Sequence, residues 1–233
     1  MPTFHLLAID TATEACSAAL LIGDSLIERS EIAPRRHAEL ILPMIESLLA
    51  EAGLSRRQLD GIAVGRGPGA FTGVRLAISV AQGLALGLDV PVVPVSSLAA
   101  LAQEAAVDEQ TPILAVIDAR MGEIYAGTFR RAAGGLVEAI GSESVGPAAK
   151  LVVPAAADWA VVGSAWAVYR DALRERLPRE PLWSDGTRLP QARSIARLAA
   201  PQFAAGKALA PELALPVYLR DKVALTLEEQ RAR

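Results

Sequence analysis

Two aspartates, Asp10 and Asp118, stand where the chemistry of this chain would be expected. Each follows an apolar run that predicts a buried strand, and a short polar turn and a second apolar run come after it, in LAIDTATEACSAAL and in AVIDARMGEIYAGT. Carboxylates placed this way could meet a nucleotide-bound cation across a cleft. They could equally be turn formers that accept hydrogen bonds from local backbone N–H groups. Asp10, the neighbouring Thr11 and Asp118 are therefore weak candidates for a cofactor site.

Other reactive side chains are sparse. The histidines are His5 and His37, and the single cysteine, Cys16, excludes an intrachain disulfide. No metal-ligand cluster can be assembled from the spacing of these residues. No serine lies in a G-x-S-x-G nucleophile elbow, although a Ser-His-Asp arrangement is not excluded by counting residues. We predict no catalytic residue, no bound metal and no cofactor.

The stretch VGRGPGAFTGVRLA, Val64 to Ala77, joins a predicted strand to a predicted helix. It matches neither the Walker A pattern, since it has no lysine, nor G-x-G-x-x-G. A strand–loop–helix junction of this kind can still cradle an anion at the helix N-terminus. The alternative is a tight turn in which Gly67 and Gly69 permit positive φ and Thr72 caps the helix. The residues alone favour the turn.

The chain divides into two halves of similar pattern. Predicted strands over 5–10, 15–23 and 25–33 precede helices over 34–52 and 72–88, with strands over 61–65 and 90–95 and a helix starting near Ser96. The aspartate-bearing hairpin then recurs, which indicates an internal duplication. We predict an α/β protein with the duplicated ribonuclease-H-like architecture of actins, sugar kinases and Hsp70 ATPases (the ASKHA fold). Its two lobes, 1–107 and 108–233, would each contain a mixed sheet.

Two helices carry more apolar surface than one sheet requires. In the helix over 34–52 the apolar residues span an arc of roughly 200°, about twice the stripe of a core-facing helix. In the next helix, small residues recur every fourth position. Both helices could be wedged inside one fold, but the sharper prediction is a contact with another subunit. The predicted interface comprises His37, Ile41, Met44, Ile45, Leu48, Thr72, Gly73, Ala77, Ala81 and Ala85.

Composition limits the partners. The net charge is −3 and the arginine doublets are scattered, so we expect no tight binding of nucleic acid by the chain alone. The N-terminus lacks the basic start of a signal peptide, and charged residues and a proline interrupt the most apolar run, Val74–Val95. We predict a cytoplasmic protein with no membrane contact.

Five segments together resemble the TsaB (YeaZ) family over essentially the whole chain. They are IDTATEACSAAL, GRGPGAFTGVRLA, PVVPVSSLAAL, IDARMGEIYAG and PVYLRDKVA. The resemblance implies the ASKHA fold and an accessory, non-catalytic role in making threonylcarbamoyladenosine in tRNA. It implies binding to the paralogous transferase TsaD, together with the ATPase TsaE, and a homodimer when the protein is alone. In the family the two apolar helices form the interface.

The same resemblance implies a loss of metal chemistry. The His-x-x-x-His pair of the paralogous enzyme falls here on Ser97 and Leu101, and leucine cannot ligate a metal ion. tRNA would then be met only within the complex. Two rival functions stay open: a nucleotide-binding kinase-like or ATPase enzyme that uses Asp10 and Asp118, and a glycoprotease-like peptidase.

Overall fold

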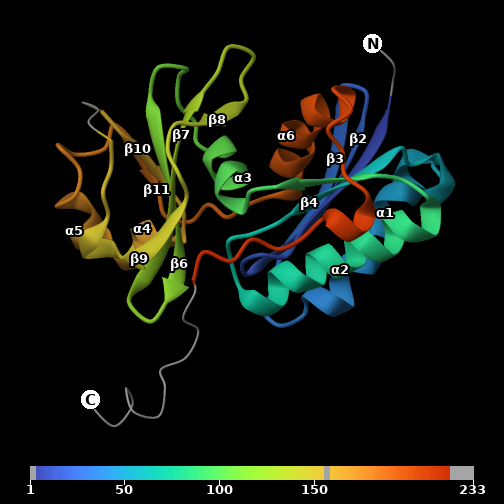
Figure 1. Ribbon diagram of the computed structural model, residues 1–233, viewed down its shortest axis with the longest axis horizontal. Helices are drawn as coiled ribbons and strands as arrows, with labels where there is room; N and C mark the ends of the chain where they lie inside the picture. The colour runs from blue at the N-terminus through green and yellow to red at the C-terminus, as the bar shows by residue number, and fades with distance from the viewer. Residues whose placement is uncertain (1–3, 155–157, 221–233) are drawn as a thin grey trace, which may run out of the picture.

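The computed structural model describes residues 4–154 and 158–220 and arranges them in five layers (Figure 1). Two mixed sheets are each covered on the outer side by helices, and two further helices lie between the sheets. The side chains of a strand alternate between the two cores on either side of its sheet. In the strand Pro112–Arg120, Ile113, Ala115 and Ile117 pack in the core between the two sheets, whereas Leu114 and Val116 pack in the core on the outer side of the second sheet. This period-two pattern is expected of strands covered on both faces.

The first sheet opens with two antiparallel hairpin connections and closes with two parallel strands. Its order is β3-β2-β1-β4-β5, with β1 antiparallel to β2 and parallel to β4. Asp10 is the last residue of β1 and pairs with Ser17 of β2. The strands are β1 (His5–Asp10), β2 (Ala15–Ile22), β3 (Ser25–Ile32), β4 (Gly61–Gly65) and β5 (Val92–Val95).

The second sheet repeats this order, which confirms the predicted duplication and the ASKHA fold. Its order β8-β7-β6-β10-β11 has the same pattern of antiparallel and parallel neighbours, and β9 also pairs with β7. Asp118 lies near the end of β6, at a register shift, in the place that Asp10 holds in β1. The strands are β6 (Pro112–Arg120), β7 (Glu123–Arg131), β8 (Val137–Ala139), β9 (Ser144–Pro147), β10 (Ala160–Val162) and β11 (Trp183–Asp185).

The helices complete the layers. Helices α1 (His37–Ala52) and α2 (Phe71–Leu88) cover the outer face of the first sheet, and α4 (Ser164–Val168) and α5 (Arg170–Arg174) that of the second. Helices α3 (Ser97–Gln103) and α6 (Ala192–Ala204) lie between the sheets. Short 3-10 turns are η1 (Arg56–Gln58), η2 (Ala148–Lys150) and η3 (Pro211–Leu213).

The central helices exchange places between the halves. α6, from the second half, packs on the first sheet, and its Ala192 N–H donates to Ser17 Oγ at 3.0 Å. α3, from the first half, packs on the second sheet, where the amide of Gln103 donates to Gly135 O at 2.8 Å. All strands of the first sheet precede residue 107 in the sequence, and all strands of the second sheet follow it. In space, each sheet is covered by a helix from the other half.

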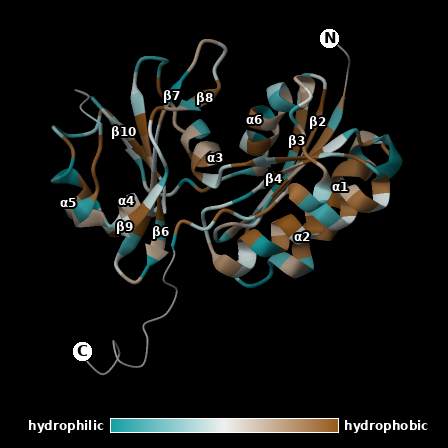
Figure 2. Ribbon diagram, viewed as in Figure 1, coloured by the Kyte–Doolittle hydropathy of each residue, from teal (hydrophilic) through white to brown (hydrophobic). Residues whose placement is uncertain are grey.

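Helix α2 has the length and composition of a membrane span, with a mean hydropathy of 1.4. Brown, apolar residues run along it and α1 in Figure 2. Its inner side, however, lies on the chain's own sheet. The segment Lys207–Arg220, which we call the C-terminal strap, packs alongside α2. The side-chain amide of Gln82 in α2 donates hydrogen bonds to Pro211 O at 3.1 Å and to Ala214 O at 3.2 Å in the strap. Residues 221–224, the end of the PVYLRDKVA motif, lie outside the described residues.

Candidate functional site

The Gly-rich segment is a packing device around the first hairpin turn. A Cβ atom on Gly65 would overlap the carboxylate of Asp10, one on Gly69 the carbonyl of Ala12, and one on Gly73 the carbonyl of Thr11. Gly67 has φ +88°, as predicted, whereas Gly69 is required by close approach and not by positive φ. The prediction that Thr72 caps the helix is wrong, because Ala70 is the N-cap of α2 and no side chain caps it.

We expect Gly73→Ala to destabilise the fold by about 3 kcal/mol, because the new methyl group meets backbone that has little room to move. Gly83→Ala, ten residues along the same helix, is the matched control. Nothing lies within 4 Å of the position its Cβ would take, so we expect a gain of about 1 kcal/mol from helix propensity. Urea unfolding of both variants measures the difference, and equal stabilities would contradict this account of the loop.

The small-residue stripe of α2 faces inward, which corrects the predicted interface. Ala77, Ala81 and Ala85 are 0% exposed and pack on the first sheet. The inward positions of α1 behave in the same way: Ile41, Ile45 and Leu48 are at most 2% exposed. These side chains, with Gly73, belong to the chain's own core because the helices must cover that sheet. Of the predicted interface residues, Thr72 is exposed and His37 and Met44 are half-buried.

What α2 presents to solvent is a different set, which we call the α2 outer face. Ser79, Gly83 and Leu86 lie three and four residues apart and so share one side of the helix. Leu86 is 63% exposed, and no atom beyond the helix's own nearby backbone lies within 4 Å of the position that a Cβ would take at Gly83 or Gly87. The α2 outer face consists of Thr72, Ser79, Gly83, Leu86 and Gly87.

The weak cofactor candidates do not come together. Asp10 and Thr11 are fully buried, and Asp10 accepts hydrogen bonds from Ala12 N–H at 2.9 Å and Ser97 Oγ at 3.4 Å. Thr11 donates its hydroxyl to Gly73 O at 2.6 Å. Asp118 instead lines a cavity, described below, and forms an ion pair with Arg120. The two strand-end aspartates therefore do not share one open site.

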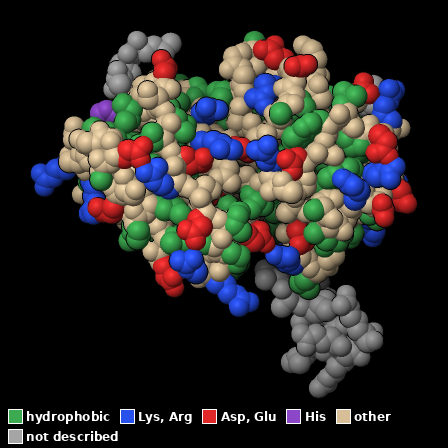
Figure 3. Space-filling view, turned by 180° about the vertical axis from the view of Figure 1, so that it is seen from behind, with side chains coloured by type: hydrophobic (Ala, Val, Ile, Leu, Met, Phe, Trp, Pro, Cys, Tyr) green, Lys and Arg blue, Asp and Glu red, His purple; other side chains and the backbone are tan. Residues whose placement is uncertain are grey.

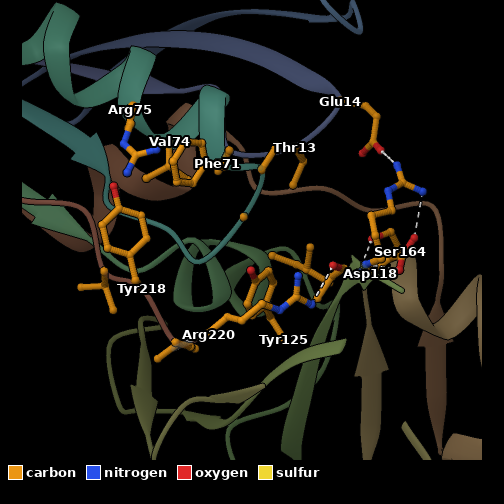
Figure 4. Close-up of a pocket in the computed structure, with 18 of the residues that line it drawn as sticks. Thr13, Glu14, Phe71, Val74, Arg75, Asp118, Tyr125, Ser164, Tyr218 and Arg220 are labelled. Carbon is orange, nitrogen blue, oxygen red and sulfur yellow. Dashed lines mark hydrogen bonds and ion pairs between the residues drawn. The ribbon is translucent and has the colours of Figure 1, made fainter. Parts of the chain in front are cut away.

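The cavity lies where the two halves meet beside the N-terminus of α2, and it has a volume of about 660 Å³ (Figure 4). On one side Arg120 bridges the two hairpins, with its guanidinium 2.7 Å from Glu14 Oε1 and 2.9 Å from Asp118 Oδ2. On the other side Arg75 lies beside the rings of Phe71 and Tyr218. Of these residues the sequence analysis singled out Asp118 but missed Glu14, Phe71, Arg75, Arg120 and Tyr218. The available signal was the scarcity of aromatic residues, which are 4% of the chain and include Phe71 and Tyr218.

His37 also lines the cavity, but its contacts do not suggest a nucleophile pair. Its Nε2 lies 2.9 Å from the carbonyl oxygen of Thr13. Within residues 4–154 and 158–220, no serine hydroxyl forms a hydrogen bond with this imidazole.

The positions that hold a metal in the paralogous enzyme do not fit one here. The Ser97 side chain is buried against Asp10, and Leu101 is 0% exposed in the core between the sheets. In the described part of the chain no three His, Cys, Asp or Glu side chains are grouped to hold a metal ion. We therefore derive no chemistry through a metal.

Two sheets of the same strand order, with exchanged helices between them, define the duplicated ribonuclease-H-like class. The family model described as "TsaD: tRNA N6-adenosine threonylcarbamoyltransferase" matches residues 27–226. The tRNA threonylcarbamoyladenosine biosynthesis protein TsaB of Escherichia coli is 41% identical over 225 residues, covering 94% of this chain and 96% of that protein. The chain belongs to the TsaB family, whose curated members are named for tRNA threonylcarbamoyladenosine biosynthesis.

Further relatives agree with this assignment. TsaB of Haemophilus influenzae is 51% identical over 126 residues, which cover 54% of this chain and 53% of that protein. Among solved structures, YeaZ from Pseudomonas aeruginosa has a TM-score of 0.85 and 45% identity, covering 93% of this chain and 100% of that one. Another structure from the same organism, 46% identical, is described as having similarity to peptidase YEAZ.

Proposed function

We propose that this chain is a non-catalytic, cytoplasmic subunit of tRNA threonylcarbamoyladenosine synthesis that binds a TsaD-type transferase and works with a TsaE-type ATPase. The observation that carries the proposal is the replacement of the paralogue's metal pair by Ser97 and Leu101. A buried leucine in the core between the sheets offers no ligand atom. The family membership gives the pathway, and the missing ligands favour a supporting role over the transfer itself.

The α2 outer face is the proposed contact with the transferase, and with a second copy when the protein is alone. Glycine inside a helix costs about 1 kcal/mol relative to alanine. Gly83 and Gly87 have open space where a Cβ would stand, so no internal contact explains them. A partner backbone that approaches closely would explain both, because only glycine leaves that room. The exposed Leu86 beside them supplies apolar area for the same contact.

We propose that this chain contacts tRNA only as part of the complex with its partners. Acidic and basic side chains are intermixed over the face shown in Figure 3, and the chain carries a net charge of −3. Tight binding to a phosphate backbone requires a concentrated positive field. A gel shift of the lone protein at physiological salt should therefore show weak binding, and ATP with magnesium should not be turned over.

We expect Ser79→Arg to weaken association with a TsaD-type protein at least tenfold, because the long charged side chain stands where the partner must approach. The matched control is Ala204→Arg, exposed at the end of α6 on the other face of the first sheet. Co-purification with a tagged TsaD-type transferase from the same organism measures association, and sedimentation measures self-association. Wild-type binding by a folded Ser79→Arg protein would remove α2 as the interface.

A further inference from the structure

Helices α3 and α6 meet at the junction between the two sheets. We call the first sheet with α1, α2 and α6 the first spatial lobe, and the second sheet with α3, α4 and α5 the second spatial lobe. The chain crosses between these lobes after β5, at Ser96, and after β11, over residues 186–191. The first crossing leads directly into α3 and the second into α6 (Figure 1). The contact between the two helices is therefore placed to control how the lobes are oriented.

The apolar part of this contact contains many small side chains. α3 and α6 both contribute alanines to the central core, namely Ala100, Ala102, Ala196 and Ala199. Burial of apolar surface favours the contact but is non-directional. Small apolar side chains alone therefore do not fix the angle at which the two helices, and with them the two lobes, meet.

Glu104 supplies a directional contact at the same place. It is the C-cap of α3, and its side chain is 5% exposed. In the first turn of α6, Arg193 donates to this carboxylate from Nε at 3.1 Å and from Nη2, and Ser194 Oγ donates to it at 2.5 Å. An acidic side chain is unfavourable at the C-terminus of its own helix and favourable at the N-terminus of another. The position of Glu104 is thus explained by α6, in the other lobe, and not by α3.

Arg193 also contacts a carboxylate of its own lobe. Its backbone N–H donates to Glu28 Oε1 at 3.0 Å, and its Nη1 donates to Glu28 Oε2 at 3.2 Å. Glu28 lies in β3, in the sheet on which α6 packs, so this pair holds α6 within the first spatial lobe. Hydrogen bonding to Glu104 raises the pKa of Arg193 above its ordinary value, and the charges of both carboxylates act in the same direction. One arginine thereby joins the two lobes.

Other contacts between the lobes are less suited to fix their angle. Glu143 accepts a hydrogen bond from Ser96 at the crossing itself, where a contact has little leverage on the angle. Two ion pairs at the cavity have more exposed side chains than Glu104, and exposed pairs contribute little. These pairs are Arg120–Glu14 and Arg220–Glu123.

We propose that Glu104, Arg193 and Ser194 form a clasp that fixes the angle between the two spatial lobes. The carboxylate accepts from two nitrogens of one guanidinium and from a hydroxyl, and charge-assisted contacts of this bidentate kind are strong and geometrically specific. Without the clasp, the lobes should turn at Ser96 and at residues 186–191 while each sheet stays intact. The clasp lies within one chain, so this inference does not depend on the proposed binding of a transferase.

Pulsed electron paramagnetic resonance on the full chain tests the clasp. Ser25→Cys in β3 and Glu138→Cys in β8 place nitroxide labels at exposed positions of the two lobes. Cys16 should stay unlabelled, because it is buried and burial raises the pKa of its thiol to about 11. We expect one narrow distribution of label distances with the clasp intact. Glu104→Gln should raise the population of other distances about tenfold, as expected for the loss of a hydrogen bond to a charged group.

Three further variants separate the clasp from general destabilisation. Glu28→Gln should lower the melting temperature, because α6 loses a contact with its own sheet, and yet keep the distances of the parent chain. Glu109→Gln, exposed after α3, removes the same charge and should change neither. Ser194→Ala removes one donor to Glu104 and is a milder change than Glu104→Gln, so it should broaden the distances less. The proposal fails if the clasp variants that fold keep the distances of the parent chain, or if Glu28→Gln broadens them as much as Glu104→Gln does.

Discussion

Ala81→Arg is expected to prevent folding, whereas Ser79→Arg, two residues earlier on the same helix, should leave the chain folded. Ala81 is 0% exposed and packs in the core between α2 and the first sheet. A guanidinium forced into that position is an unpaired buried charge, which costs several kcal/mol, and overpacking adds about 1–3 kcal/mol. A domain with a free energy of unfolding of about 5–15 kcal/mol loses most or all of its stability.

Ser79 is exposed, so its replacement by arginine should change stability by no more than about 0.5 kcal/mol. Circular dichroism and thermal melting of the two variants measure this contrast. A cooperative melt of Ala81→Arg near the wild-type temperature would place that side chain at the surface and reinstate the small-residue stripe as a contact. The pair thus separates failure to fold from failure to associate.

Stability is expected to fall as the pH rises toward 7, through the titration of Asp10. Burial raises the pKa of this carboxyl from its ordinary value of 3.8 to about 7, although hydrogen bonds from Ala12 N–H and Ser97 Oγ act in the opposite direction. The native state therefore holds a proton that the unfolded chain releases, between pH 3.8 and about 7. The free energy of unfolding therefore declines by up to about 4 kcal/mol across that pH window and is constant at higher pH.

Asp10→Asn removes this titration and keeps an oxygen that can accept from Ala12 N–H. Urea unfolding at several pH values should show the variant gaining on the wild type as the pH rises from about 5 to 8. Cys16 does not confuse the reading, since burial and the nearby Asp10 raise the pKa of its thiol to about 11. Ser97→Ala should move the window upward, because it removes a hydrogen bond that favours the carboxylate. Parallel pH profiles for wild type and Asp10→Asn would contradict the assignment.

The sequence predicted the architecture because its signals are local and repeated. The strand ending in Asp10 and the one ending near Asp118 carry the same order of apolar run, turn and apolar run, and the sheets built on them have the same topology. Ser96 was also a readable start signal: its hydroxyl accepts from Leu98 N–H at 3.1 Å and caps α3. The TsaB resemblance predicted the family, which the comparisons confirm.

The sequence does not show in the same way which side of α2 packs on the sheet and which side faces solvent. Periodicity showed that Ala77 and Ala81 share a side with Gly73, but both sides of the helix are apolar enough to be buried. The side of α2 that is buried is set by the backbone of Thr11 and Ala12, which approaches the helix closely from another part of the chain. The cavity was hidden for a similar reason, since Arg35, Arg75 and Tyr218 are far apart in sequence and line one cavity only in the folded chain.

The exchange of α3 and α6 has a consequence for synthesis on the ribosome. The first sheet is complete in sequence by Val95, yet the helix that covers its inner face ends at Ala204. The nascent first half must therefore emerge with one apolar face of its sheet uncovered until most of the chain has been translated. Pairing residues so distant along the chain slows folding and prolongs exposure of apolar surface. In the growing chain, this uncovered face is where chaperone binding and misassembly between neighbouring polypeptides are expected to concentrate.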